Sequence, residues 1–207
     1  GNTHALTTYQ KVALASHEGY GLSRTCPTEY LLSHIGRDGV VVKVLHVVSV
    51  DTKGGKSLLR QSVERLKGLL PIENILVVTG KSLAKATYRE LPELPRKNVL
   101  LEPCRRDTAA AVATACTEVG KRGGDDAVAA ILTADHLMKN EKSFRRILSL
   151  AVDSAAKSED IVTMGVKPTY PATGFGYIKV GKPCGKVFRA EKFVEKPDEK
   201  TAKRSLK

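Results

Sequence analysis

The sequence has few aromatic residues and no long hydrophobic run. Phe and Tyr make up 5% of its 207 residues and tryptophan is absent, so stacking platforms for single-stranded nucleic acid are scarce. The richest apolar run, at 40–50, is broken by Lys43 and His46 and falls short of a membrane helix. The start also lacks the pattern of a secretory signal. We therefore expect a cytoplasmic protein with no membrane association.

Cysteine is also sparse. The four cysteines, Cys26, Cys104, Cys116 and Cys184, show no CxxC spacing and have no histidine at zinc-ligand spacing. Reduced thiols in a cytosolic protein are the better interpretation.

Negative charge is in deficit. Lys and Arg number 34 against 22 Asp and Glu, which gives a net charge of +12 and favours anionic partners such as nucleic acid or phosphorylated metabolites. The basic residues are scattered without a run of five or more, which disfavours a nucleic-acid binder. That class stays open as an alternative.

From residue 57 onward, amphipathic helices alternate with short apolar strands. Helices are predicted at 57–70, where Pro71 ends the pattern, and at 143–156. Strands are predicted at 74–79, 98–101, 127–132 and 160–164. This order predicts an α/β fold, a Rossmann-like, doubly wound and mostly parallel sheet with helices on both faces. In such sheets ligands bind at the carboxyl ends of the strands.

After Lys167 the pattern changes to extended segments with Gly and Pro turns, which predict a mixed or antiparallel extension and a final helix from Asp198. Residues 1–207 are interpreted as one domain. The first 56 residues fit the alternation of helices and strands poorly. One strand is expected at 11–15, and the apolar stretch within 37–53 looks like an insertion.

Five stretches lie after predicted strands or in turns: GGKSLLRQSVERL, EPCRRDTAAAVA, LTADHLM, KPTYPATGFGYIKVG and FVEKPD. In order and spacing they resemble the mannose-1-phosphate guanylyltransferase branch of the sugar nucleotidylyltransferases over about 150 residues. The resemblance implies the nucleotide-diphospho-sugar transferase type of fold. It also implies synthesis of GDP-mannose and pyrophosphate from GTP and mannose 1-phosphate, which is a hexose 1-phosphate. The implied cofactor is Mg²⁺.

The EPCRRDTAAA stretch combines a strand end, an arginine and a helix start. Glu102 ends the strand, while Arg106 and the first helix amides face the same crevice, which suits a nucleotide. An ordinary helix capped by Asp107 is the alternative. The resemblance implies that Glu102, Arg106, Asp107 and Thr108 contact the guanine nucleotide.

Asp135 follows directly on an apolar strand and so emerges at the carboxyl end of the sheet. A carboxylate there can bind Mg²⁺, which bridges phosphate oxygens. A turn-forming aspartate beside a packed His136 is the alternative. The resemblance assigns the metal to Asp135.

Two stretches near the end are candidates for the sugar phosphate. Gly174 and Gly176 let a backbone approach a sugar without a Cβ, although a plain turn has the same composition. Glu195 and Lys196 are adjacent and so are expected on opposite sides of an extended segment. The resemblance has the glutamate bind sugar hydroxyls and the lysine face the phosphate, whereas a solvated charge pair is the alternative.

The family opens with a strand and the loop GGxGTRLxPLS, which cradles the triphosphate. Here Gly19, Gly21 and Arg24 retain part of it, about five residues are missing between Gly21 and Leu22, and Thr28 stands where a lysine is expected. Both losses remove positive charge directed at phosphate, so impaired catalysis is expected. Arg24 is the remaining catalytic candidate.

The sequence also ends before the rest of the family's sugar site, which indicates a domain incomplete at its C-terminus. A non-catalytic nucleotide- and sugar-phosphate-binding module is therefore a second hypothesis beside the enzyme. A homo-oligomer is compatible with either hypothesis.

Overall fold

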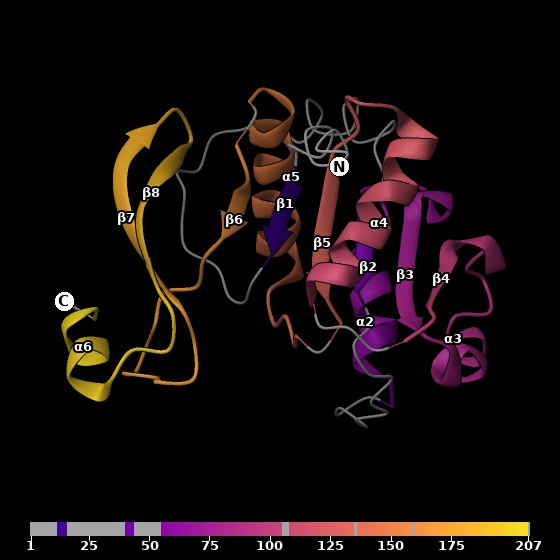
Figure 1. Cartoon of the computed structure of the whole chain (residues 1–207), viewed down its shortest axis with the longest axis horizontal. Coiled ribbons are helices and arrows are strands. Elements are labelled where there is room, and N and C mark those ends of the chain that lie inside the picture. Colours follow the sequence, from indigo (N-terminus) through magenta and orange to yellow (C-terminus); the bar gives the residue numbers. More distant parts are fainter. Residues whose placement is uncertain are drawn as a thin grey trace, which may run out of the picture. The chain divides into compact units, whose positions relative to one another are not determined.

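The computed structural model describes residues 12–15, 40–43, 55–104, 108–134, 136–158 and 160–206. The described residues up to Met164 form one compact unit, and those from Gly165 onward form a second. Figure 1 labels the elements of both units.

The first unit contains a six-stranded sheet in the order β4-β3-β2-β5-β1-β6, in which every pairing is parallel. Its strands are β1 (Val12–Ala15), β2 (Val40–Lys43), β3 (Ile75–Gly80), β4 (Val99–Glu102), β5 (Ala129–Thr133) and β6 (Val162–Met164). Apolar side chains fill the interior strands: the first four residues of β3 and the first four of β5 are apolar and buried. Such runs are typical of strands covered on both faces.

The helices of this unit connect the parallel strands. They are α2 (Leu58–Glu64), α3 (Ala84–Glu90), α4 (Thr108–Gly123) and α5 (Glu141–Ala156), with short 3-10 turns η1 (Ile72–Asn74), η2 (Lys81–Leu83) and η3 (Arg96–Asn98). Side chains cap two of them: Ser57 Oγ accepts from the Arg60 amide at 3.0 Å, and Asn140 Oδ1 accepts from the Ser143 amide at 2.9 Å.

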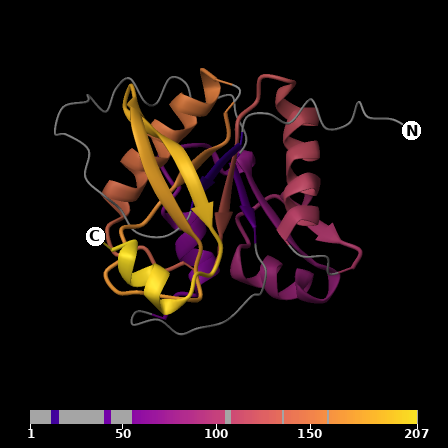
Figure 2. The same cartoon turned by 60° about the vertical axis from the view of Figure 1, so that its left-hand side comes forward.

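Two hydrophobic clusters cover the two faces of the sheet. One joins α2 and α5 to Val77, Ala130 and Leu132, and the other joins α4 to Val78 and Ile131. Figure 2 shows α4 and α5 on opposite sides of the strands. The predicted doubly wound α/β fold with helices on both faces is therefore confirmed.

The first long helix ends earlier than the sequence pattern predicts. Its α-helical part stops at Glu64, and turns lead to Pro71, with Gly68 at φ 83°. The Arg65 side chain folds back so that its Nε donates to the Gln61 carbonyl at 3.2 Å, which also accepts from the Arg65 amide at 3.0 Å. Leu66 and Leu70 still reach the core, so the apolar spacing is preserved without the helix.

The connections between strands run in opposite directions across the sheet on the two sides of the β2–β5 boundary. From β2 it steps to β3 and β4, whereas β5, β1 and β6 lie on the other side. This switch point is where open α/β sheets bind their ligands. Residues 40–43 belong to the stretch interpreted as an insertion, and here they form a central strand.

The second unit is built on an antiparallel hairpin, as the change of pattern after Lys167 predicts. Strands β7 (Tyr177–Cys184) and β8 (Val187–Val194) pair along their length, with a turn at Gly185 and Lys186 in which Gly185 has φ 62°. Helix α6 (Glu199–Arg204) follows, and Asp198 Oδ1 accepts from the Thr201 amide at 2.7 Å. The predicted final helix is present and begins where expected.

Candidate functional site

The carboxyl edge of the parallel sheet brings together the ends of several strands. Gly80 at the end of β3 is paired with Glu102 at the end of β4, and Lys43 of β2 with Thr133 of β5. Glu102 thus lies on the predicted edge, half-buried, on a strand two places from the switch point. Lys43 also lies at this edge. The sequence pattern gave it no role, because the order of strands in a sheet has no local sequence signal.

Helix α4 follows β4 closely and begins at Thr108, so its first amides open at the same end of the sheet as Glu102. Free amides and the helix dipole favour an anion at such a position. Arg106 and Asp107, the other predicted nucleotide contacts of this stretch, lie outside the described residues, and so does the capping role predicted for Asp107.

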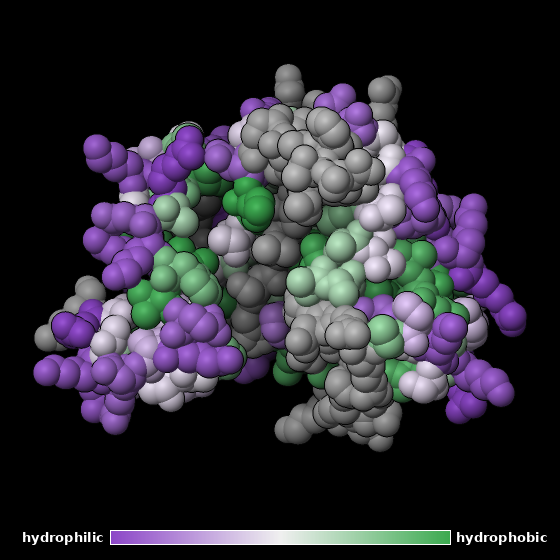
Figure 3. Space-filling view, in the orientation of Figure 1, coloured by the Kyte–Doolittle hydropathy of each residue, from purple (hydrophilic) through white to green (hydrophobic). Residues whose placement is uncertain are grey.

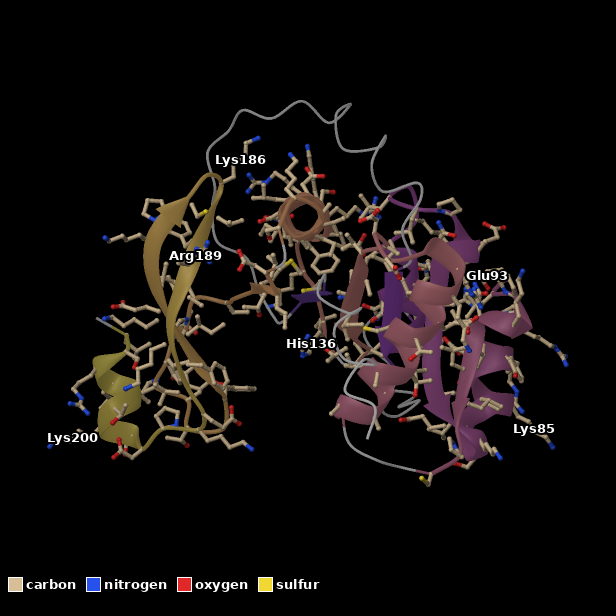
Figure 4. The ribbon with its side chains drawn as sticks, turned by 45° about the horizontal axis from the view of Figure 1, so that its top comes forward. Lys85, Glu93, His136, Lys186, Arg189 and Lys200 are labelled. Carbon is tan, nitrogen blue, oxygen red and sulfur yellow. The ribbon has the colours of Figure 1, made fainter. Side chains whose placement is uncertain are left out.

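The turn after β5 is fixed by hydrogen bonds. Thr133 Oγ1 and His136 Nδ1 share a hydrogen bond at 2.7 Å, and His136 is half-buried; Figure 4 labels it in the first unit. Asp135, the predicted metal ligand, lies outside the described residues. A pocket close to the size of one water molecule borders the turn. Its lining residues are Ser62, Arg65, Leu132, Thr133, His136, Met138 and Phe144.

Arg65 lies at this pocket and is 3% exposed. Its Nη2 donates to Ser62 Oγ and to the His136 carbonyl, both at 2.8 Å, and its guanidinium lies over the Phe144 ring, 5.6 Å from the centroid. Burial lowers the pKa of Arg65 to about 10, against the opposing charge of Glu141. Sequence reasoning missed this residue, because an arginine beside a helical apolar stripe has the same pattern as a solvated one.

In the second unit, the structure brings Gly176 and Glu195 together. A Cβ placed on Gly176 would lie 2.4 Å from Phe193 Cζ and 3.0 Å from Glu195 Oε2. The bare backbone at this glycine is therefore needed by the chain's own β8 end. Gly174, by contrast, has nothing within 4 Å of such a Cβ.

Glu195 and Lys196 do not point to opposite sides, and that expectation is wrong. Strand β8 ends at Val194, and Lys196 has φ 41°, so the alternation of an extended strand stops before this pair. Lys196 Nζ lies 3.5 Å from Glu195 Oε1. A positive φ outside glycine costs about 1–3 kcal/mol and often marks a functional position.

The hairpin itself is open to solvent. Hydrophilic and hydrophobic side chains stand side by side on β7 and β8 (Figure 3), and Val180, Phe188 and Phe193 are exposed. Figure 4 labels Lys186 at the hairpin turn and Arg189 on β8.

Several predicted site residues cannot be placed on this framework. The remains of the glycine-rich loop, Gly19, Gly21 and Arg24, lie outside the described residues. The strand expected before them is β1, which lies between β5 and β6 rather than at the switch point.

The described residues offer few candidate ligands for magnesium. In the described part of the chain no group of three or more His, Cys, Asp or Glu side chains could hold a metal ion. Magnesium bound to a nucleotide needs only one or two carboxylates beside the phosphates, so a single carboxylate at the carboxyl edge of the sheet is enough. Among the residues that the structure describes, no helix combines the length and apolar character needed to cross a bilayer.

The nucleotidyl transferase family model matches residues 48–207, which is more than half of the chain. The chain belongs to the nucleotidyl transferase family. The match begins just after β2 and includes Gly80, Glu102 and Thr133 at the carboxyl edge and the β7–β8 hairpin of this nucleotidyl transferase.

Curated relatives carry related names. A Sinorhizobium fredii mannose-1-phosphate guanylyltransferase is 35% identical over 147 residues, which are 70% of this chain and 28% of the relative. The alginate biosynthesis protein AlgA of Pseudomonas putida is 37% identical over 157 residues, 72% of this chain and 31% of AlgA. The xanthan biosynthesis protein XanB of Xanthomonas campestris pv. campestris is 44% identical over 104 residues, 50% of this chain and 22% of XanB. The chain thus spans less than a third of these relatives.

Solved structures agree on the fold. A Thermus thermophilus protein named a mannose-1-phosphate geranyltransferase is 29% identical with a TM-score of 0.69, covering 82% of this chain and 53% of its own. A mannose-6-phosphate isomerase from Helicobacter pylori is 24% identical with a TM-score of 0.62. The match covers 80% of this chain and 64% of the isomerase chain. The second shares the fold alone.

Proposed function

We propose that this chain transfers a guanylyl group, forming GDP-mannose and pyrophosphate from GTP and mannose 1-phosphate in the cytoplasm. The observation that supports it most directly is the carboxyl edge of the sheet. There Glu102 and the start of α4 stand together, in a chain that belongs to the nucleotidyl transferase family. The names of the relatives suggest the base and the sugar.

The reaction needs no side-chain nucleophile. A phosphate oxygen of the sugar phosphate attacks the α-phosphorus of GTP, the bond from that phosphorus to the oxygen shared with the β-phosphate breaks, and pyrophosphate leaves with the electron pair. The protein acts by positioning and by offsetting charge. We assign the nucleotide to Glu102, Arg106, Asp107 and Thr108, and the triphosphate to Gly19 and Gly21 with Arg24.

The sugar phosphate is assigned to the second unit. Glu195 accepts hydrogen bonds from sugar hydroxyls beside the bare backbone of Gly176, and Gly174 leaves further room. Lys196 neutralises the phosphate, from a backbone position with φ 41°. Magnesium, when bound, offsets charge on the phosphate oxygens, and we assign it to Asp135.

Pyrophosphate release from GTP and mannose 1-phosphate with Mg²⁺ tests the proposal, with calorimetric binding of each ligand to the same preparation. We expect release that is abolished in Asp135→Ala. Asp125→Ala is the matched control, because Asp125 is exposed and precedes β5 at the opposite end of that strand.

Binding without release would replace the enzyme by the non-catalytic binding module. No binding of either ligand would refute both assignments and leave the fold. Steeply salt-dependent binding of DNA or RNA in that case would support the nucleic-acid alternative.

A further inference from the structure

Arg65, a buried arginine, connects the end of α2 to the turn after β5. It is not one of the residues that we assign to a substrate. The Arg65 side chain donates to three different oxygen atoms: the Gln61 carbonyl, Ser62 Oγ and the His136 carbonyl. Ser62 Oγ in turn donates to the Ala134 carbonyl at 3.4 Å. The guanidinium and one hydroxyl therefore hold the carbonyls of Ala134 and His136.

These two carbonyls belong to the chain neighbours on either side of residue 135. The Thr133 to His136 hydrogen bond holds the same turn from the sheet side. Arg65 is itself fixed, since Arg145 Nε donates to its carbonyl at 2.7 Å and the Phe144 ring lies against its guanidinium. Helices α2 and α5 thus both determine where the turn lies.

Stability alone is a poor reason for this arrangement. A cation is costly to bury unless it is paired, and these three hydrogen-bond acceptors of Arg65 are a hydroxyl and two carbonyls rather than a carboxylate. Apolar residues of similar volume often replace buried ionic groups with no loss of stability. The planar fork of arginine, however, can hold several acceptors in a fixed geometry.

We propose that Arg65 is a positioning residue for the reaction: together with Ser62 it holds the carbonyls of Ala134 and His136, and so the backbone on either side of the residue to which we assign magnesium. Ser62 is the second part of the device. This inference rests on the proposed function, because it assigns a purpose to the turn only if a nucleotide with magnesium binds at that edge.

The test compares Arg65→Met with the same change at an exposed arginine that also makes several hydrogen bonds but lies at the other edge of the sheet. Arg122 donates to Asn98 Oδ1 at 2.7 Å, the Lys97 carbonyl at 3.1 Å and Glu118 at 2.8 Å. Lys97 and Asn98 precede β4, so Arg122→Met removes a comparable set of hydrogen bonds far from the carboxyl ends. Thermal unfolding of both variants measures the structural cost.

The first readout is the ratio of the GTP dissociation constants measured without and with Mg²⁺. The second is amide hydrogen exchange in peptides covering 133–138. In Arg65→Met we expect the ratio to fall by about tenfold, the lower end of what supporting residues of metal sites contribute, and exchange to accelerate. Arg122→Met should leave both unchanged. Arg65→Lys, which keeps the charge but loses the fork, should recover part of the ratio.

If Arg65→Met does not fold, Ser62→Ala and Arg65→Lys decide, with the same direction and a smaller effect. A normal ratio in the folded Arg65 and Ser62 variants, with only a loss of melting temperature, would reduce Arg65 to a structural role and leave the proposed function standing. Wild-type protein that binds GTP equally with and without Mg²⁺, or not at all, would overturn the inference together with the proposed magnesium site.

Discussion

Strands β3 and β7 differ in how much of each is covered by the rest of the chain. The first five residues of β3 are buried, whereas every residue of β7 is partly or fully exposed. Parallel strands need both faces covered, and helices on each side supply that cover for β3. A two-stranded hairpin has marginal stability by itself.

The difference separates the nucleotide candidates from the sugar-phosphate candidates. The nucleotide candidate Glu102 stands at the end of a strand in a packed sheet, whereas Gly176 and Glu195 stand at the base of an exposed hairpin. Local openings cost least where few apolar contacts are made. We therefore expect the sugar-phosphate residues to be the more easily displaced, and the following changes probe that contrast.

The largest effect is expected at Asn98, a buried side chain of the first unit. Its Nδ2 donates to the Glu73 carbonyl at 2.7 Å and the Ile75 carbonyl at 2.9 Å. Asn98→Ala leaves these carbonyls and the Arg122 donor without this partner and should cost about 3 kcal/mol in urea unfolding. GTP affinity should persist in the folded fraction, because Asn98 precedes β4. A cost below about 1 kcal/mol would contradict this account of the first unit.

A matched pair of valines tests the contrast directly. Val63 is 0% exposed and Val180 is 61% exposed. Val63→Ala removes two buried methyl groups and should lower the free energy of unfolding by about 2 kcal/mol, whereas Val180→Ala should stay within about 0.5 kcal/mol. Equal losses would mean that the hairpin is covered in solution.

A smaller change is expected from Gly176→Ala. The new methyl group would displace the Phe193 ring, which is exposed and can rotate, and crowd the Glu195 carboxylate. Stability should change little, while mannose 1-phosphate affinity should fall about tenfold, because small misplacements of positioning groups are costly. Gly165→Ala, with open space at its Cβ, is the calorimetric control. Unchanged affinity would remove Gly176 and Glu195 from the sugar site.

The smallest effect concerns the cap of α6. Hydrogen bonds from the Thr201 side chain and amide lower the pKa of Asp198 below its usual value. A carboxyl group with a depressed folded pKa stabilises the fold above its unfolded pKa and loses that contribution as the pH falls through the folded value. NMR shifts of α6 should therefore report fraying at a lower pH than an ordinary aspartate would give, and Asp198→Asn should remove this pH dependence. Fraying that is identical in the variant would assign it to another group.

The sequence predicted the fold where local pattern decides it. The strands predicted at 74–79 and 127–132 occur at Ile75–Gly80 and Ala129–Thr133, and the helix at 143–156 occurs at Glu141–Ala156. Their signals are apolar runs and helical spacing, which depend on near neighbours.

What the sequence did not predict depends on contacts between distant residues. The central place of β2 is set by pairing with β3 and β5, and the early end of α2 involves Arg65, whose partners include His136, far along the chain. The shared side of Glu195 and Lys196 follows from one backbone angle. For the candidate site, the edge of the sheet and the place of Glu102 were predicted, while the roles of its residues remain predictions for the experiments above.

The place of β1 has a consequence for how the chain reaches its native state. Its partners are β5 and β6, and Val12 pairs with Ala129, so β1 leaves the ribosome long before either partner has been synthesised. Pairings between such distant segments form slowly and leave unpaired strand edges exposed to aggregation in the meantime. During synthesis β2, β3 and β4 can associate first, and β1 can enter the sheet only after β5 has emerged.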